Sequence, residues 1–431
     1  MDLSEKIKSM ILSGIVEEHH RKIGVEIESF YYKKGSLNRL AVNNKNQYSA
    51  SDLLFDINKI TKNNKDEYTY SLEPGGQLEW ASTPTISLWE ILNEYSKNML
   101  IQQELCANNA IDIGYFSVEP ISSPLDIELI NSNKYQLMHN LFKSTGKLGP
   151  WMMRNTASIQ INIDYTSEQD ANEMAFVADA IQPLISILFS NAPFIKGKKV
   201  NSKNLRWKIW SNTDSSRCGT LFEHNIHNQK NIINDYVEWI QSRGCIFIEN
   251  PEGIFNAFDG DLGSMIATEK NPELIYSACR QIFTHVRFKK VLEVRGSDRQ
   301  QKGKDILPAA FLVGLLTSKK TRDTLLDEID SWSKKDRDDL SKCAFDLSFS
   351  NFGPKQKSIG YWLEFLSQLA LDGLDERSKL YNIKNERPLL EMDLKNIINN
   401  GPETLQIQKK LNKSEQTLKS FINENYLDSF E

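Results

Sequence analysis

The chain has 431 residues, of which 40% are hydrophobic and 25% charged, proportions typical of a soluble globular protein. Its formal net charge of −5 gives no reason to expect nucleic acid or an acidic membrane surface as a partner. No run of about 18 apolar residues occurs and the N-terminal stretch is highly charged, so we expect neither a transmembrane helix nor a secretory signal.

The chain begins with a predicted helix followed by a predicted strand. Apolar residues at helical spacing predict an amphipathic helix over residues 3–18. In the next stretch, aliphatic residues alternate with Gly24, Glu26 and Glu28, which is the period of a half-buried strand. Glu26 and Glu28 then share one strand face, with roughly 6–7 Å between their Cβ atoms, a spacing that suits a metal ion. For this stretch alone, the alternative is a solvated face with two ordinary glutamates.

A polar stretch leads to a second acidic one. Residues 33–65 are rich in Asn and Lys and predict a hairpin or loops at a sheet edge. The Pro-Gly-Gly sequence at 74–76 predicts a sharp turn, because glycine adopts positive φ freely. The pattern then alternates up to Ala81, which places Glu79 on a polar strand face. A turn flanked by Glu73 and Glu79 can bring carboxylates close to a cation.

The middle of the chain contains the most regular predicted strand. Helices are predicted over residues 86–108 and 135–144, with a strand and a proline-bounded loop over 112–124 between them. Residues 157–165 alternate strictly, with alanine and isoleucines on one face. The other face carries Ser158, Gln160, Asn162 and Asp164.

Helices, loops and a further strand follow. An apolar pattern predicts a long helix over residues 170–191, interrupted at Pro183 because proline lacks a backbone N–H. Residues 204–219 predict loop and strand, and residues 271–283 predict a helix. A single strand over 286–295 would place on one face Arg287, Lys289, Val291, Glu293 and Arg295.

From about residue 306 onward, the pattern predicts helices almost throughout. They are expected over residues 308–317, 320–333, 336–344, 359–378, 387–399 and 402–426. No repeat or low-complexity linker divides the chain. We therefore expect one domain over residues 1–431, of the α+β class, with a mostly antiparallel sheet and a helical C-terminal third.

The five cysteines are scattered along the chain. Their spacing matches neither a zinc motif nor a disulfide framework, and their number is odd. Free thiols of this kind are typical of a reducing compartment. We therefore expect the protein in the cytoplasm.

The predicted polar strand faces share one chemical character. They carry carboxylates, amides and arginines, whereas a solvated sheet face usually carries lysine, threonine and mixed charges. Carboxylate oxygens suit a hard cation such as Mg²⁺, which shares its coordination shell with substrate phosphates. Arg295 and Arg217 would then contact phosphate, for which guanidinium is the preferred partner. No P-loop, protein-kinase motif set or G-x-G-x-x-G occurs, so the common nucleotide-binding folds lack support.

Residues 206–219 form a charged and aromatic segment. Arg206 and Arg217 flank two tryptophans, an arrangement that suits the carboxylate of an amino acid held against an aromatic wall. A structural Arg–Trp cluster at the surface is the alternative. No histidine within residues 206–219 accompanies Cys218 as a base, so a structural thiol is favoured over a nucleophile.

Six motifs occur in order between residues 23 and 316. They are IGVEIESF, SLEPGGQLEWAS, WMMRNTASIQINIDY, QPLISILFSNAPF, RWKIWSNTDSSRCG and RFKKVLEVRGSD…LPAAFLVGLL. With these motifs the chain resembles the glutamate–cysteine ligase family, in its plant and proteobacterial branch, which is related to glutamine synthetase. The resemblance runs from about residue 15 to at least residue 380, whereas residues 253–273 and those just after Arg295 differ from the usual family pattern.

The resemblance implies a fold and a reaction. The fold is a curled, mostly antiparallel sheet that forms a funnel-shaped active site with helices outside. The reaction joins the γ-carboxylate of glutamate to the amine of cysteine, with ATP and Mg²⁺ or Mn²⁺, through a γ-glutamyl phosphate, as the first step of glutathione synthesis. Small molecules would be the partners, and the protein would be a monomer or a homodimer.

The motifs also imply roles for individual residues. The metal ligands would be Glu26, Glu28, Glu79, Glu293 and Glu73. Gln160, Asn162 and Arg295 would line the nucleotide side, and Arg295 and Arg217 would act on phosphate as the catalytic residues. Glutamate would be held by Arg206, Trp210, Ser158 and Arg154.

Two other hypotheses remain at this stage. One is an amide ligase of the same mechanism that uses another amino acid or acceptor amine in specialised metabolism, because acceptor specificity lies in loops. The other is an inactive relative retained as a binding or regulatory subunit. The presence of Glu26, Glu28, Glu79, Glu293 and Arg295 argues against an inactive relative.

Overall fold

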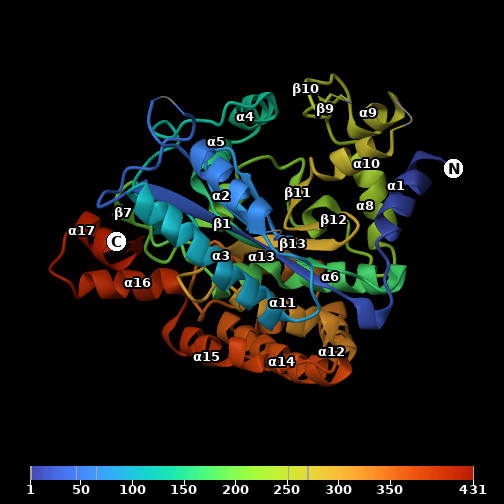
Figure 1. Ribbon diagram of the computed structural model, residues 1–431. Coiled ribbons are helices and arrows are strands. Elements are labelled where there is room, and N and C mark those ends of the chain that lie inside the picture. Colours follow the sequence, from blue (N-terminus) through green and yellow to red (C-terminus); the bar gives the residue numbers. More distant parts are fainter. Residues whose placement is uncertain (1, 45, 65, 251, 269–270, 431) are drawn as a thin grey trace.

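The centre of the molecule is an eight-stranded sheet in which each strand pairs antiparallel with its neighbours. The computed structural model describes residues 2–44, 46–64, 66–250, 252–268 and 271–430. Helices lie on both sides of this sheet (Figure 1), which confirms the predicted mixture of helices and a mostly antiparallel sheet. Within the described residues, no helix is both long and apolar enough to span a bilayer.

The long strand β1 (Ile23–Lys33) organises the sheet. Its first half pairs on one side with β3 (Leu78–Ala81) and on the other side with β5 (Ser158–Ile163), and its last residues pair with β4 (Ile111–Gly114). The sheet is extended by β2 (Thr69–Leu72) beside β3, by β13 (Leu292–Asp298) and β12 (Val286–Phe288) beyond β5, and by β14 (Leu427–Ser429) beside β4.

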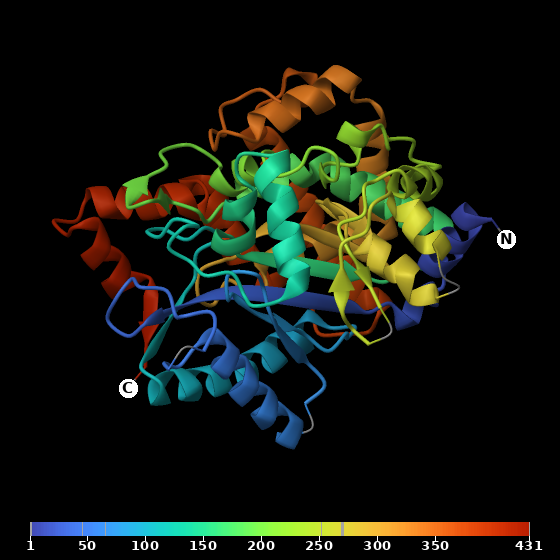
Figure 2. The ribbon, with the colours of Figure 1, turned by 90° about the horizontal axis from the view of Figure 1, so that it is seen from above.

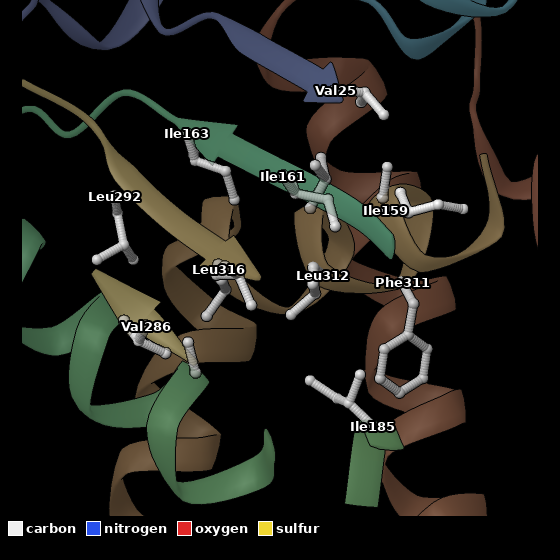
Figure 3. Packing of buried hydrophobic residues seen from close by; sticks show 14 of the residues in the cluster. Val25, Ile159, Ile161, Ile163, Ile185, Val286, Leu292, Phe311, Leu312 and Leu316 are labelled. Carbon is white, nitrogen blue, oxygen red and sulfur yellow. The ribbon is translucent and has the colours of Figure 1, made fainter. Parts of the chain in front are cut away.

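The aliphatic face of the sheet packs on the C-terminal third of the chain. Val25 of β1 and the isoleucines of β5 are fully buried. Figure 3 shows Ile159 and Ile161 beside Leu312 of α11 (Leu307–Thr317). Every residue of α11 is buried, because the sheet covers one side of this helix and other helices cover the rest. Truncating one such core side chain to alanine costs about 2–5 kcal/mol.

Two glycines let α11 approach α14 (Ile359–Leu380) closely. A Cβ on Gly314 would lie 2.2 Å from the carbonyl oxygen of Ala370, and one on Gly373 would lie 1.9 Å from the carbonyl oxygen of Gly314. The helix pair therefore needs glycine at both positions. It forms a compact lower layer, which Figure 1 shows beneath the sheet.

The opposite, polar face of the sheet lies under a different set of elements. Figure 1 shows α4 (Asn133–Thr145), α5 (Gly149–Asn155) and the hairpin of β9 (Ile248–Glu249) and β10 (Phe255–Asn256) above the sheet, and Figure 2 shows α4 and that hairpin in front of it. Further helices of the chain are α7 (Leu205–Trp210), α10 (Pro272–Cys279), α12 (Lys319–Asp330), α13 (Lys334–Cys343) and α15 (Glu391–Asn400).

Residues 33–65 contain a helix, α2 (Ala50–Asn64), where a hairpin or loops were predicted. The prediction was wrong because Leu53, Ile57 and Thr61, which are buried, recur at helical spacing among many polar residues. Reciprocal hydrogen bonds between Ser49 and Asp52 cap its first turn. Lys45 and Lys65, which fell in this prediction, lie outside the described residues.

Other helix boundaries also differ from expectation. The first helix, α1 (Leu3–Leu12), ends well before residue 18. Helix α6 (Glu168–Leu188) continues through Pro183 instead of being interrupted there, because burial from residue 170 to 188 holds it in place by packing. The single helix expected over 402–426 is two helices, α16 (Glu403–Asn412) and α17 (Leu418–Asn425).

Two strand predictions also need correction. The strand expected over 286–295 is the β12–β13 hairpin, in which Arg287 pairs directly with Glu293. The C-terminal strand β14 was missed, because three residues carry too little alternation to be recognised. The segment 204–219 begins with helix α7, which Asn204 caps through the N–H of Trp207, and contains only a short strand, β8 (Cys218–Gly219). The strands around Glu26, Glu79 and Gln160 were predicted correctly.

Candidate active site

Three carboxylates converge on the polar face of the sheet. Glu28 of β1 lies directly opposite Glu79 of β3 in the strand register. Glu73 reaches them from the turn between β2 and β3, which is closed by a 2.9 Å hydrogen bond from the N–H of Glu73 to the carbonyl of Gln77. One carboxylate oxygen from each of Glu28, Glu73 and Glu79 lies within 4.8 Å of the other two. We call these three residues the acidic triad.

The charges of the acidic triad oppose one another. Burial, and then the charge of Glu73, raises the pKa of Glu28 to about 7. Burial and the neighbouring glutamates raise the pKa of Glu79 well above its usual value, and burial raises the pKa of Glu73. A divalent cation among these oxygens would offset the repulsion. The donor set, three carboxylates without cysteine or histidine, fits Mg²⁺ or Mn²⁺.

Strand β5 orients the glutamates. Ser158 donates both its backbone N–H and its hydroxyl to the Glu28 carboxylate, each at 2.9 Å. Nε2 of Gln160 donates to Glu28 at 3.2 Å and to Glu79 at 3.3 Å. Nδ2 of Asn162 donates to Glu26 at 2.9 Å. Glu26 therefore lies on the same face but is bound to an amide, outside the acidic triad.

A second group surrounds Glu293 on β13. The carboxylate of Glu293 is fully buried, and its Oε2 accepts from Nε of Arg287. Nζ of Lys289 lies 2.6 Å from Oε1, and Nη1 of Arg295 lies 3.3 Å from Oε2. These three cations hold the pKa of Glu293 well below its usual value even though burial alone would raise it. We call Arg287, Lys289 and Arg295 the cation group.

The acidic triad and the cation group face one cavity of about 400 Å³. Gln160 connects the two, because its Oε1 accepts from Nη1 of Arg295 at 2.6 Å while its Nε2 donates to the triad. Further cations on the cavity wall are Lys134, Arg206 and Arg280, and its aromatic residues are Tyr135, Trp210, Phe247, Tyr276 and Phe283. A cavity with a cation-binding end and an anion-binding end suits a ligand that carries phosphate and a metal ion together.

Arg206 and Trp210, one helical turn apart on α7, both line this cavity. The guanidinium of Arg206 lies 5.6 Å from the centre of the Trp210 ring and donates to the carbonyls of Gly296 and Arg295 at 3.1 and 3.3 Å. Its Nε is buried without a hydrogen-bond partner in the described structure. The pair therefore offers a buried cation beside an aromatic face, as the sequence suggested.

Four predicted site residues do not line the cavity, and one of them is Glu293, which lies behind the cation group. The Arg217 guanidinium is held by Asp214 at 3.0 Å and by the carbonyls of Gln281 and Gly244. Arg154 donates to the carbonyl of Pro124, and Asn162 contacts the cavity only through its partner Glu26. Cys218 is a buried thiol whose pKa burial raises to about 12, which fits the structural thiol expected from the sequence.

Sequence reasoning overlooked several cavity residues. Arg287 and Lys289 were placed on a strand face without a role, and only the hairpin brings them onto Glu293. Lys134 comes from α4 and Arg280 from the end of α10, far apart in sequence. No local pattern marks these two residues, of which Lys134 directly precedes one predicted helix and Arg280 lies in the last turn of another.

Comparison with known proteins places this site in a family context. A family model described as glutamate-cysteine ligase family 2 matches residues 22–345. The chloroplastic glutamate–cysteine ligase A of Oryza sativa subsp. indica is 27% identical over 365 residues, covering 78% of this chain and 71% of that protein. The chloroplastic glutamate–cysteine ligase of Arabidopsis thaliana is 26% identical over 403 residues, covering 86% and 74%.

A solved structure shares the fold. The 2.0 Å crystal structure of a glutamate–cysteine ligase from Francisella tularensis in complex with AMP aligns with a TM-score of 0.59 at 12% identity. The alignment covers 94% of this chain and 87% of that chain. At this identity the likeness concerns the arrangement of the helices and strands alone.

Proposed function

Because the chain belongs to the glutamate–cysteine ligase family 2, we propose that it is an ATP-dependent ligase that forms γ-glutamylcysteine. The enzyme joins the γ-carboxylate of L-glutamate to the amine of L-cysteine through a γ-glutamyl phosphate, the first step of glutathione synthesis. The observation that carries this function is the single cavity in which the acidic triad and the cation group are linked by Gln160.

The acidic triad would hold Mg²⁺ or Mn²⁺. Such a cation supplies charge for the phosphate oxygens of ATP, so that a carboxylate can approach the terminal phosphate. Ser158 and Gln160 keep the carboxylates of Glu28 and Glu79 oriented toward this place, because their donors fix oxygens that would otherwise repel each other. Glu26, on the same face, is a further candidate ligand, and the metal role predicted for Glu293 stays a prediction.

The cation group would bind the transferred phosphate. Glu293 neutralises one of the three positive charges, which leaves Arg287, Lys289 and Arg295 with a net charge of about +2 for the group as a whole. Fixed cations aimed at a developing charge stabilise the transition state without having to reorganise. Arg295 is the principal candidate, since it also contacts Gln160. The phosphate role of Arg217 remains a prediction. It is not favoured by the structure of the segment, because Asp214 already accepts a hydrogen bond from the Arg217 guanidinium.

Arg206 would bind the α-carboxylate of glutamate. Its unpartnered Nε and its place beside Trp210 give a planar donor next to an aromatic wall. Ser158 also lines the cavity, where its hydroxyl donates to the Glu28 carboxylate. The predicted contributions of Arg154 and Asn162 would be indirect, through the backbone near the Pro-Gly-Gly turn and through Glu26 respectively.

The remaining features of the proposal concern the whole chain. The polar face of the sheet, with α4, α5 and the β9–β10 hairpin above it, would form the wall of a funnel that leads to the acidic triad. Residues 1–431 would act as one catalytic unit, as a monomer or a homodimer, in the cytoplasm.

An ADP-release assay with the purified protein tests this function. Glutamate and cysteine together with ATP and Mg²⁺ should release ADP and yield γ-glutamylcysteine, detected by mass spectrometry. The assay is repeated with a panel of other amino acids and amines in place of cysteine. Production of AMP and pyrophosphate would contradict the acyl-phosphate route, and a faster reaction with another amine would replace cysteine as the acceptor.

A further inference from the structure

The turn that carries Glu73 is held by hydrogen bonds within it and to neighbouring segments. Its Pro74 carbonyl accepts from the N–H of Ile130 at 2.8 Å, and its Gly75 carbonyl accepts from Nη2 of Arg39 at 2.9 Å. Within the turn, the N–H of Gly76 donates to the carbonyl of Glu73 at 2.9 Å. Most backbone polar groups of this short segment therefore have a fixed partner.

The turn also has no steric freedom. A Cβ on Gly75 would lie 2.5 Å from the carbonyl oxygen of Arg154, so this position touches backbone. Gly76 has a φ of +76°, a conformation that glycine adopts readily. The turn therefore packs closely against the end of α5, and its conformation depends on its contacts with that helix end.

The amide of Gln77 links the two sides of this contact. Its Oε1 accepts from the N–H of Gly75 at 3.0 Å, and its Nε2 donates to the carbonyls of Thr156 at 2.7 Å and Met153 at 3.4 Å. The side chain is only 1% exposed. One amide therefore ties the turn to the segment between α5 and β5.

That segment leads directly into the residue that orients Glu28. Ser158, two residues after Thr156, binds the Glu28 carboxylate through two hydrogen bonds. Gln77 consequently sets the position of the Glu73 turn relative to the strand that orients the other triad members. Through this contact one carboxylate oxygen of Glu73 is kept within 4.8 Å of an oxygen of each of the other two glutamates.

We propose that Gln77 is a positioning residue that holds Glu73 within the acidic triad and thereby sets the affinity of the site for a divalent cation. This inference rests on the proposed function in one respect, namely that the triad binds such a cation. Gln77 itself acts through Glu73, in the manner of the outer partners that orient metal ligands in other sites.

The inference is tested with Mn²⁺ as the probe. Mn²⁺ binding to the full-length protein is titrated by electron paramagnetic resonance, without substrates, for the wild type and for Gln77→Met. We expect about 10- to 100-fold weaker Mn²⁺ binding in the variant. The matched control is Gln408→Met, which also removes a buried amide, one that donates to the carbonyl of Asn201 on a part of the chain outside the cavity. The control should bind Mn²⁺ as the wild type does.

A double-mutant cycle separates positioning from a general loss of structure. In the Glu73→Gln background, Gln77→Met should change Mn²⁺ affinity by less than threefold, because the ligand that Gln77 positions is already absent. Equal effects of Gln77→Met in both backgrounds would overturn the proposal. If Gln77→Met does not fold, Gln77→Asn replaces it, since the shorter amide cannot reach both Gly75 and Thr156.

The outcomes also distinguish this inference from the proposed function. A wild-type protein that binds no Mn²⁺ contradicts the cation site itself. A wild-type protein that binds Mn²⁺, with Gln77→Met binding equally well, overturns the role of Gln77 alone.

Discussion

Glu79 and Glu293 belong to the same sheet, separated by strands β1 and β5, yet the surroundings of their carboxylates are opposite. Glu79 lies among three other glutamates, and the pKa of its carboxyl is raised by burial and then by the charges of Glu26, Glu73 and Glu28. Glu293 lies among two arginines and a lysine, and these cations lower its pKa although burial opposes them.

The two carboxylates share a residue type and a sheet, but the charges around them differ in sign. A buried carboxylate that already has three cations is electrostatically satisfied by the protein. A partly buried cluster of carboxylates that forms no ion pair among the described residues is costly until a cation enters. This contrast supports our proposal that the acidic triad holds the metal ion and that the cation group around Glu293 binds an anion, while the metal role predicted for Glu293 stays a prediction.

The largest expected effect would come from removing the Glu293 charge. Glu293→Gln should lower the free energy of unfolding by about 3–5 kcal/mol, because it leaves the buried Arg287 and the partly buried Lys289 and Arg295 without their counter-charge. Urea unfolding followed by circular dichroism measures this. Unchanged stability would show that the cation group does not depend on Glu293.

The same substitution at Glu79 should act in the opposite direction. Without metal at pH 8, Glu79→Gln should stabilise the fold by on the order of 1 kcal/mol, because it removes a carboxylate that the neighbouring glutamates repel. It should also lower ligase turnover by more than about 100-fold, as expected on loss of a metal ligand. Thermal unfolding in the presence of a chelator, together with the ADP-release assay, tests both parts. A destabilised Glu79→Gln variant would contradict the expected opposite effects of the two substitutions on stability.

A smaller effect is expected at Arg206, for which we propose binding to the substrate glutamate and no role in the acidic triad or at Glu293. Arg206→Lys should raise the KM for glutamate by about one to two decades, because a charged hydrogen bond is worth roughly 1.5–3 kcal/mol and lysine cannot form two parallel bonds. The KM for ATP should change by less than about threefold. Steady-state kinetics with each substrate varied in turn measure both constants. A selective loss of ATP affinity would assign Arg206 to the nucleotide.

The smallest effect concerns pH. The pKa of Glu28 is raised to about 7, so protons compete with the cation and Mn²⁺ binding should weaken about tenfold from pH 8 to pH 6. The stability of the metal-free protein has the opposite dependence. A raised carboxyl pKa stabilises the fold below the unfolded value, near 4.5, and this contribution is lost as the pH rises through 7. Mn²⁺ titrations across this range, compared with Glu28→Gln, test the assignment, and equal affinity at both pH values would contradict it.

Much of the site was readable from local pattern. The alternation around Glu26, Glu79 and Gln160 predicted polar strand faces, and the strands are where they were expected, because a period of two fixes which side chains share a face. The Pro-Gly-Gly sequence predicted the turn that places Glu73. Helix α2 was missed because its few buried residues are diluted by Asn and Lys.

By itself, the sequence determined the strand faces, the turn, the helical C-terminal third and the family, since each depends on short-range spacing or on motifs in order. Only the tertiary structure decided which acids meet which cations. The β12–β13 hairpin places Arg287 beside Glu293, and Lys134 and Arg280 line the cavity from two separate helices. The physical reason is that a carboxylate's charge is offset by groups within a few ångströms in space, and distance along the chain does not determine which groups these are.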